Sequence, residues 1–183
     1  MTLRHAFIDE SIRNDGWYRL TVVTIAARDV NRVVRDLRPL RPEGRQRLHF
    51  SSEGDAVRHR ILDGVTRLPF SATTFAAPYR RGRNDDPARG HCLEAMVDRL
   101  APEVALLVLD SRGPHRDVVD RRVLRGALAS RRDLEGVSYV HRGSRDEPML
   151  ALPDVIGWAV GAGGRFGAKV APIAEQVFLG KDG

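Results

Sequence analysis

EVALLVLD, residues 103–110, is an unbroken apolar run that ends in an aspartate. A strand of this kind is typically buried on both faces, as in the centre of a parallel sheet. Nearer the N-terminus, HAFIDES (residues 5–11) predicts a second apolar strand, which runs into the adjacent carboxylates Asp9 and Glu10. Two like charges side by side are costly when buried, so the pair requires either a cation or a solvated turn.

The rest of the pattern predicts an α/β chain. Strands are expected at 3–9, 17–27, 70–79, 103–110 and 136–142, and helices at about 29–37, within 48–68, and at 87–100, 115–129 and from Pro153. Asn14-Asp15-Gly16 predicts a hairpin between the first two strands, and the glycine-rich residues 161–167 predict a helix break. We therefore expect a mixed five-stranded sheet, an antiparallel meander followed by parallel strands, flanked by helices and with a helical insertion at about 28–68.

Length and composition favour one ordinary globular domain over residues 1–183. A single cysteine, Cys92, excludes an internal disulfide framework and a cysteine-rich zinc site, and we expect it in the core. The sequence contains no apolar run of membrane-spanning length and no signal-peptide pattern at its start, so we expect a cytoplasmic protein that does not contact a membrane.

The formal net charge is +6, and all but two of the 30 basic residues are arginines. Arginine binds phosphate in a bidentate manner, so this arginine-rich positive charge modestly favours nucleic acid as a partner. A GC-rich genome would also enrich the chain in arginine. Two clusters would follow a nucleic-acid backbone if they flank the site, and are otherwise solvated surface: Arg38, Arg41, Arg45 and Arg47, and Arg80, Arg81 and Arg83.

Three aspartates are the candidate metal ligands. Asp9 and Asp110 each close an apolar strand, and the two strands are expected to be neighbours with their carboxyl ends together. Asp154 is the only charge in LALPDVIGWAVGA (residues 150–162), where it falls in a first helical turn. Converging carboxylates suit Mg²⁺ or Mn²⁺, which prefer oxygen ligands. Singly, each aspartate is equally explained as a turn or helix-end residue, so the prediction depends on all three.

The order of strands and acids resembles the ribonuclease H-like fold, and FIDESI (7–12) and LALPDVIGWAV (150–160) resemble the opening and closing motifs of the bacterial family called domain of unknown function 3800. The resemblance implies a metal-dependent, nuclease-like core over nearly the whole chain. The chain departs from the family pattern at four positions: Ile12 replaces a glycine, Leu150 and Pro153 replace a glutamine and an alanine, and Arg47 stands where the middle segment has an acid.

Three further residues are weighed as site residues. By analogy with the fold, Glu94 on the helix before 103–110 is a candidate catalytic acid, and an exposed helix residue is the alternative. His49 is a candidate proton carrier or a structural histidine. Glu10 should point away from Asp9, where it is solvated or paired with an arginine, unless it reaches a second metal ion.

These residues predict a divalent-metal-dependent nuclease that hydrolyses phosphodiester bonds, with Asp9, Asp110 and Asp154 as ligands. The alternative is a non-catalytic module that binds nucleic acid or an acidic protein. A third hypothesis is an accessory of a bacterial defence or mobile-element system whose site a protein partner completes. The choice between RNA and DNA, the cleavage mode and the oligomeric state are not encoded in any motif.

Overall fold

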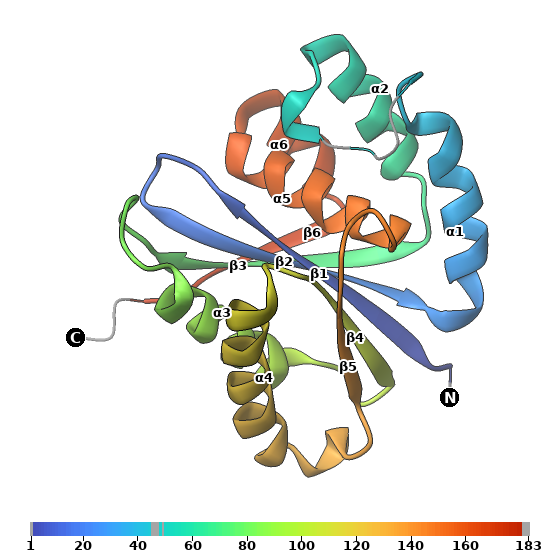
Figure 1. The fold of residues 1–183 in the computed structure, drawn as a ribbon. Helices are drawn as coiled ribbons and strands as arrows, with labels where there is room; N and C mark the ends of the chain where they lie inside the picture. Colours follow the sequence, from blue (N-terminus) through green and yellow to red (C-terminus); the bar gives the residue numbers. More distant parts are fainter. Residues whose placement is uncertain (1, 45–47, 49, 181–183) are drawn as a thin grey trace.

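The computed structural model describes residues 2–44, 48 and 50–180. Within these residues, six strands form one sheet in the order β5-β4-β1-β2-β3-β6 (Figure 1). The strands are β1 (Arg4–Ile12), β2 (Trp17–Ala26), β3 (Phe70–Pro78), β4 (Val104–Asp110), β5 (Ser138–Arg142) and β6 (Ala174–Phe178). Antiparallel pairing joins β1 to β2 and β2 to β3, while β4, β5 and β6 each join a parallel neighbour. The predicted meander, and the pairing of β4 beside β1, are confirmed.

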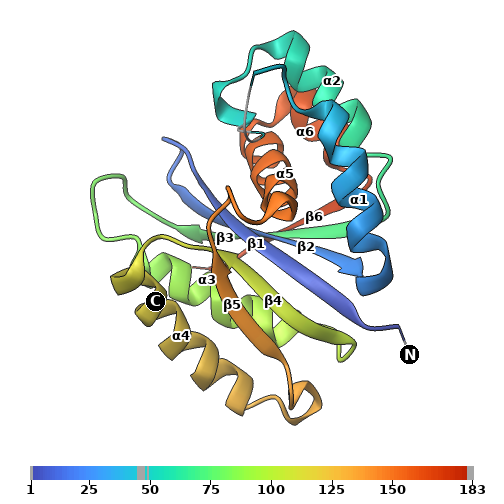
Figure 2. The same ribbon diagram turned by 45° about the vertical axis from the view of Figure 1, so that its right-hand side comes forward.

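Helices cover both faces of the sheet. They are α1 (Val30–Leu37), α2 (Asp55–Val65), α3 (Asp86–Arg99), α4 (Pro114–Ala129), α5 (Ala151–Ala162) and α6 (Gly164–Val170). In both ribbon views α1, α2, α5 and α6 lie on one face, and α3 and α4 lie on the other (Figures 1 and 2). Among the described residues, no helix combines the length and apolar character that a membrane span requires.

Each face of the sheet carries its own apolar core, and β1 contributes to both. Phe7 belongs to the cluster that includes α5, whereas Ile8 belongs to the cluster that includes α3. Because successive strand residues point to opposite faces, Asp9 follows Phe7 toward α5 and Glu10 follows Ile8 toward α3. The strand therefore directs the two adjacent carboxylates to opposite faces of the sheet.

The prediction of five strands was wrong by one. After α6 the chain does not end in a helix and a tail: Ala174–Phe178 form β6, parallel to β3. This strand has five residues and lies at the edge of the sheet, so it lacks the long apolar run that marks a central strand. It forms because the edge of β3, which is distant in sequence, offers backbone groups that would otherwise be unpaired.

β1 also extends further than the residues 3–9 predicted from sequence. It continues to Ile12 because Glu10, Ser11 and Ile12 pair with β2. Its parallel pairing with β4 stops at Ile8 and Leu109. Asp9 thus lies inside one strand pair but just beyond the last paired residues of the other, at the carboxyl end of β4.

The helical insertion between β2 and β3 is confirmed as α1 and α2. Within the predicted range of 48–68, the second helix begins only at Asp55, because Phe50–Ser52 form a short 3-10 turn. The predicted helix break is also confirmed. It falls at Gly163 and Gly164, which have φ angles of 64° and 50° and separate α5 from α6.

Gly157 allows α5 to pack closely on β1 and β2. A Cβ atom here would lie 2.6 Å from Thr21 Oγ1 and 3.4 Å from Ser11 Cβ, and Thr21 is held by a 3.0 Å hydrogen bond to Thr74. We expect Gly157→Ala to lower the free energy of unfolding by about 1–2 kcal/mol, because overpacking outweighs the better helix propensity of alanine.

The matched control is Gly126→Ala in α4, where nothing lies within 4 Å of the added atom. This change should raise the free energy of unfolding by up to about 1 kcal/mol. Urea denaturation of both variants measures the two effects. A gain of stability in Gly157→Ala would contradict the tight contact between α5 and the sheet.

Candidate metal centre

A cavity of about 700 Å³ opens at the carboxyl ends of β1 and β4, beneath α5. Asp9, Asp110 and Asp154 all line it. The other lining residues are Glu10, Val34, Leu37, Arg38, Arg41, Leu48, Ser144, Arg145, Pro148, Leu150 and Ala151. The three aspartates therefore come from three elements far apart in sequence and meet at one edge of the sheet, where α/β folds commonly place their sites.

Local structure holds two of the three carboxylates in defined orientations. Asp9 Oδ1 accepts a 2.7 Å hydrogen bond from the backbone N–H of Glu10. Asp154 lies in the first turn of α5, where the helix dipole stabilises negative charge, and its Oδ2 accepts a 3.2 Å hydrogen bond from the N–H of Phe50. Asp110 is the last residue of β4. All three side chains belong to partly buried residues, so they are shielded but reach the cavity.

The charges of these residues act on one another. Burial raises the pKa of Asp9 well above its ordinary value, and the charges of Glu10, Asp110 and Asp154 raise it further. The carboxylates are therefore close enough to disfavour one another's ionised forms. A divalent cation relieves this repulsion, and an all-oxygen donor set suits Mg²⁺ or Mn²⁺. The chemistry of this donor set thus fits such an ion, although the ligand oxygens of the three aspartates do not all lie within 4.8 Å of one another, so the carboxylates would have to draw together around it.

Although Glu10 borders the cavity, its carboxylate is turned toward Arg89 on the opposite face, as the alternation along β1 requires. Arg89 Nη1 donates a 2.8 Å hydrogen bond to Glu10 Oε2, a 3.1 Å bond to Tyr18, and its Nε and Nη2 both donate to Asp120 at 2.8 Å. His141 Nε2 lies 3.1 Å from the same Asp120 carboxylate. Of the alternatives for Glu10, the structure shows the ion pair with an arginine, and its carboxylate is occupied in that pair.

This network was not predicted from the sequence. One signal was present: Arg89 lies on the same helix face as Cys92, Leu93 and Met96, which are buried, so a charged residue interrupts an apolar stripe. An arginine in such a position requires a buried acid as partner. The partner, Asp120 on α4, could not be chosen from the sequence because it is one of many charged residues on that helix.

Among the described residues, the one tight group of three ligand-type side chains lies within this network and not at the three aspartates. One atom each from Asp117, Asp120 and His141 lies within 4.8 Å of the others, a spacing that a metal ion can bridge. However, burial, which alone would raise the pKa of Asp120, is outweighed by hydrogen bonds from His141 and Arg89, which lower it to about 2. Asp117 accepts a 3.0 Å bond from the N–H of Arg112. Because arginines already balance this charge, we interpret the group as structural.

The other predicted residues lie elsewhere. Glu94 is exposed on α3, on the far face of the sheet, and lines a different hollow from that of the three aspartates. The reason is that α3 turns Cys92, Leu93 and Met96 into the core, which leaves Glu94 toward solvent. Cys92 is buried as expected, and burial raises the pKa of its thiol to about 12, so it is not a nucleophile. His49 lies outside the described residues.

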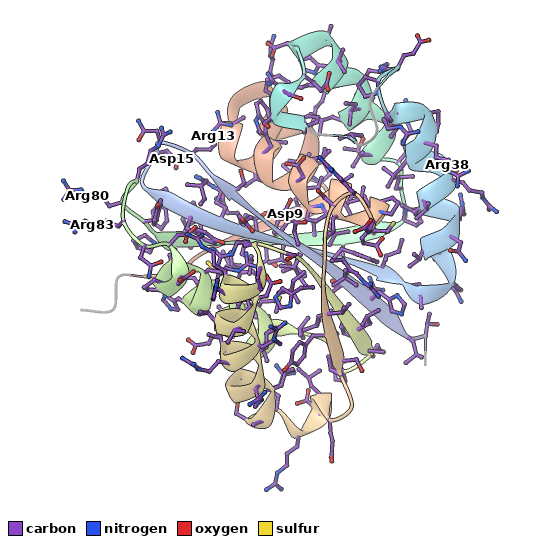
Figure 3. The ribbon with its side chains drawn as sticks, viewed as in Figure 1. Asp9, Arg13, Asp15, Arg38, Arg80 and Arg83 are labelled. Atoms are coloured by element: carbon purple, nitrogen blue, oxygen red, sulfur yellow. The ribbon has the colours of Figure 1, made fainter. Side chains whose placement is uncertain are left out.

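Basic side chains border the cavity. Arg38 and Arg41 follow α1 and line it, as does Arg145 from the segment after β5. Arg80 and Arg83 lie in the loop after β3, at the far side of Asp9 from Arg38 (Figure 3). Arg45 and Arg47 of the first cluster lie outside the described residues, so the structure tests only part of the predicted basic track.

No protein-family model matches the sequence, and no curated protein matches it either. Solved structures do match the fold. Ribonuclease H2 from Pyrococcus horikoshii OT3 superposes with a TM-score of 0.58 at 11% identity, over 85% of this chain and 71% of that one. Ribonuclease HII from Archaeoglobus fulgidus, solved in a complex with PCNA, superposes with a TM-score of 0.52 at 15% identity, over 84% and 69%. The fold is ribonuclease H-like. At these identities the likeness establishes the architecture, and the residues of the cavity must carry any statement about function.

Proposed function

We propose that this ribonuclease H-like chain is a divalent-metal-dependent nuclease that hydrolyses phosphodiester bonds. The observation that supports this proposal is the convergence of Asp9, Asp110 and Asp154 on one cavity, with arginines at its border. The resemblance of FIDESI and LALPDVIGWAV to the family called domain of unknown function 3800 agrees with the proposal.

In this proposal the three aspartates hold Mg²⁺ or Mn²⁺. When bound, the ion supplies an activated water and neutralises charge on the scissile phosphate and the leaving oxygen. The chain itself orients the carboxylates that would hold the ion. The backbone N–H groups of Glu10 and Phe50 hold the carboxylates of Asp9 and Asp154 in place. The apolar lining residues, among them Leu37 and Leu150, exclude water and strengthen electrostatic interactions in the cavity.

The arginines would position the nucleic acid. A guanidinium group matches the oxygens of a phosphodiester and keeps its charge at every physiological pH. Arg38, Arg41 and Arg145 line the same cavity as the aspartates, so a phosphate placed over the acids would also lie near these cations. The proton donor for the leaving oxygen remains a prediction, with His49 as the candidate from sequence.

The test is cleavage of labelled RNA, single-stranded DNA, duplex DNA and RNA–DNA hybrid in Mg²⁺, Mn²⁺ or EDTA. We expect metal-dependent cleavage by the wild type, and loss of it by about a hundredfold or more in Asp110→Asn. Asp98→Asn, the same change at an exposed residue of α3, is the matched control and should cleave normally.

Calorimetric titration with Mn²⁺ gives a second readout, in which Asp110→Asn should bind the ion more weakly than Asp98→Asn. A folded wild type that neither cleaves nor binds the ion would overturn the proposal. Metal-independent binding of nucleic acid in that case would support the alternative of a non-catalytic binding module.

A further inference from the structure

A second hollow, of about 440 Å³, adjoins the acidic cavity. The two share Glu10 and Asp154 as lining residues. The remaining lining comes from the end of β1 and the turn after it, from the 3-10 turn at Phe50–Ser52, and from α5 through Trp158. We call it the Trp158 hollow. A substrate strand lying over the three aspartates and continuing toward the β1–β2 turn would enter it.

The Trp158 hollow contains a cation that the fold holds in place. The guanidinium carbon of Arg13 lies 5.0 Å from the centroid of the Trp158 ring. The stem of Arg13 crosses α5 at Gly161, where a Cβ atom would lie 2.7 Å from Arg13 Cδ. Figure 3 shows Arg13 between the β1–β2 turn and α5. Glycine at 161 leaves room for this approach, and a larger residue there would push the Arg13 side chain aside.

The ring beneath Arg13 is itself fixed. Phe50 and Phe166 make edge contacts with Trp158 at centroid distances of 5.1 and 5.2 Å, and the guanidinium of Arg58 lies 4.3 Å from its centroid. Arg58 is anchored in turn by hydrogen bonds to the backbone oxygens of Phe50 and Ser51. The platform for Arg13 is therefore rigid, and little side-chain freedom remains to be lost when Arg13 binds a ligand.

Arg13 differs in its partners from the next arginine along the chain. Arg19 forms an ion pair of 2.7 Å with Asp15, whereas no salt bridge joins Arg13 to an acid among the described residues. Of the two acids in the hollow, Glu10 is bound to Arg89. The positive charge of Arg13 is thus directed at a space that is open to a ligand, and this space is continuous with the acidic cavity.

We propose that the Trp158 hollow binds the nucleotide next to the scissile phosphate, with Arg13 holding the phosphate of that nucleotide. A guanidinium donates two parallel hydrogen bonds to a phosphate. Ile12, which is 40% exposed, offers an apolar contact for the sugar or base beside it. The inference rests on the proposed function in so far as the strand in the cavity is a nucleic acid, and it adds that the strand extends past the aspartates toward the β1–β2 turn.

The test uses the fluorescence of Trp158. The chain has two tryptophans, so a Trp17→Phe background leaves Trp158 as the only one. The probe is a short single-stranded oligonucleotide with phosphorothioate linkages, which resist cleavage, titrated in EDTA and in Mg²⁺. We expect binding to change the fluorescence of Trp158. In Arg13→Gln the affinity should fall about tenfold or more, and the slope of log affinity against log salt should decrease by about 0.7.

Two variants separate position from charge. Gly161→Ala keeps the charge of Arg13 but displaces its side chain, and alanine favours the helix, so this variant should fold and should bind several-fold more weakly. Arg122→Gln, at an exposed position of α4 on the far face of the sheet, removes the same charge and should bind like the wild type.

Unchanged affinity in Arg13→Gln, or no change of Trp158 fluorescence in either buffer, overturns the inference. Failure of the proposed function is recognised separately. If Arg13→Gln loses binding while Asp110→Asn and the wild type show the same cleavage, the nucleotide site stands and the catalytic role of the aspartates does not. If Asp110→Asn loses cleavage while Arg13→Gln binds normally, only the present inference fails.

Discussion

Asp9→Asn should abolish metal-dependent cleavage and, without metal, make the protein more stable. The loss of cleavage, about a hundredfold or more, follows from removal of one of the three carboxylates to which the proposed function assigns the metal ion. The gain in stability follows from the environment of Asp9, because burial and the charges of Glu10, Asp110 and Asp154 disfavour its ionised form. An asparagine still accepts the hydrogen bond from the N–H of Glu10, so the local geometry is kept.

The pH dependence of this gain gives a sharper measurement. A carboxyl group whose pKa is raised by folding costs no stability below its ordinary value of 3.8, and its cost grows as the pH rises through the raised pKa. The denaturation midpoint of Asp9→Asn should therefore exceed that of the wild type at pH 7 in EDTA, and the two should converge near pH 3.

Addition of Mn²⁺ should reverse the order at neutral pH, since ligand binding stabilises the protein that holds the ion more tightly. Asp98→Asn serves as the matched control and should show neither effect. A destabilised Asp9→Asn protein in EDTA at pH 7 would contradict this account of the site.

Arg89→Met should lower the free energy of unfolding by about 3–5 kcal/mol, the largest loss that we expect from any single change. Arg89 is fully buried, and Asp120 is 1% exposed, so the substitution leaves a carboxylate without its bidentate partner inside the protein. Glu10 loses its partner as well. Methionine has a similar length and no charge, so the loss reports on the ion network instead of on a cavity.

The control is Arg99→Met on the same helix. Arg99 pairs with Glu175 at 3.3 Å, but the two side chains are 50% and 58% exposed, so its loss should cost less than about 1 kcal/mol. The double variant Arg89→Met/Asp120→Leu should recover part of the loss, because removing both charges of a buried pair costs less than removing one. Equal effects of Arg89→Met and Arg99→Met would contradict the structural role of the network.

The ion network around Arg89 and Asp120 also predicts how the free energy of unfolding depends on pH. Hydrogen bonds from His141 and Arg89, against the opposing effect of burial, give Asp120 a pKa of about 2 in the fold, below its ordinary 3.8. A lowered pKa contributes stability above 3.8, and this contribution is lost as the pH falls toward 2. The difference between the wild type and Arg89→Met should therefore narrow over this interval, which urea denaturation at several pH values can follow.

Local patterns were sufficient for most of the architecture. The apolar run at 104–110, the turn at Asn14-Asp15-Gly16 and the helical spacing of Val30, Val33 and Leu37 each express a preference of neighbouring residues, and the structure contains the corresponding strand, hairpin and helix. β6 was missed because its five residues become a strand only through pairing with β3, about a hundred residues earlier in the chain. Propensity cannot encode a partner at that distance.

At the candidate site, local pattern was enough to identify the carboxylates and their faces. β1 runs through Asp9, β4 ends at Asp110, and alternation along β1 directs Asp9 and Glu10 to opposite faces. Which residues share a cavity depended on the packing of elements that are far apart in the chain. This packing brought Asp154 and Arg38 to the aspartates, turned Glu94 toward the other side of the sheet, and placed Arg13 over Trp158. The physical reason is that a residue's own chemistry sets what it can bind, whereas helix packing on the two faces of the sheet sets which residues meet.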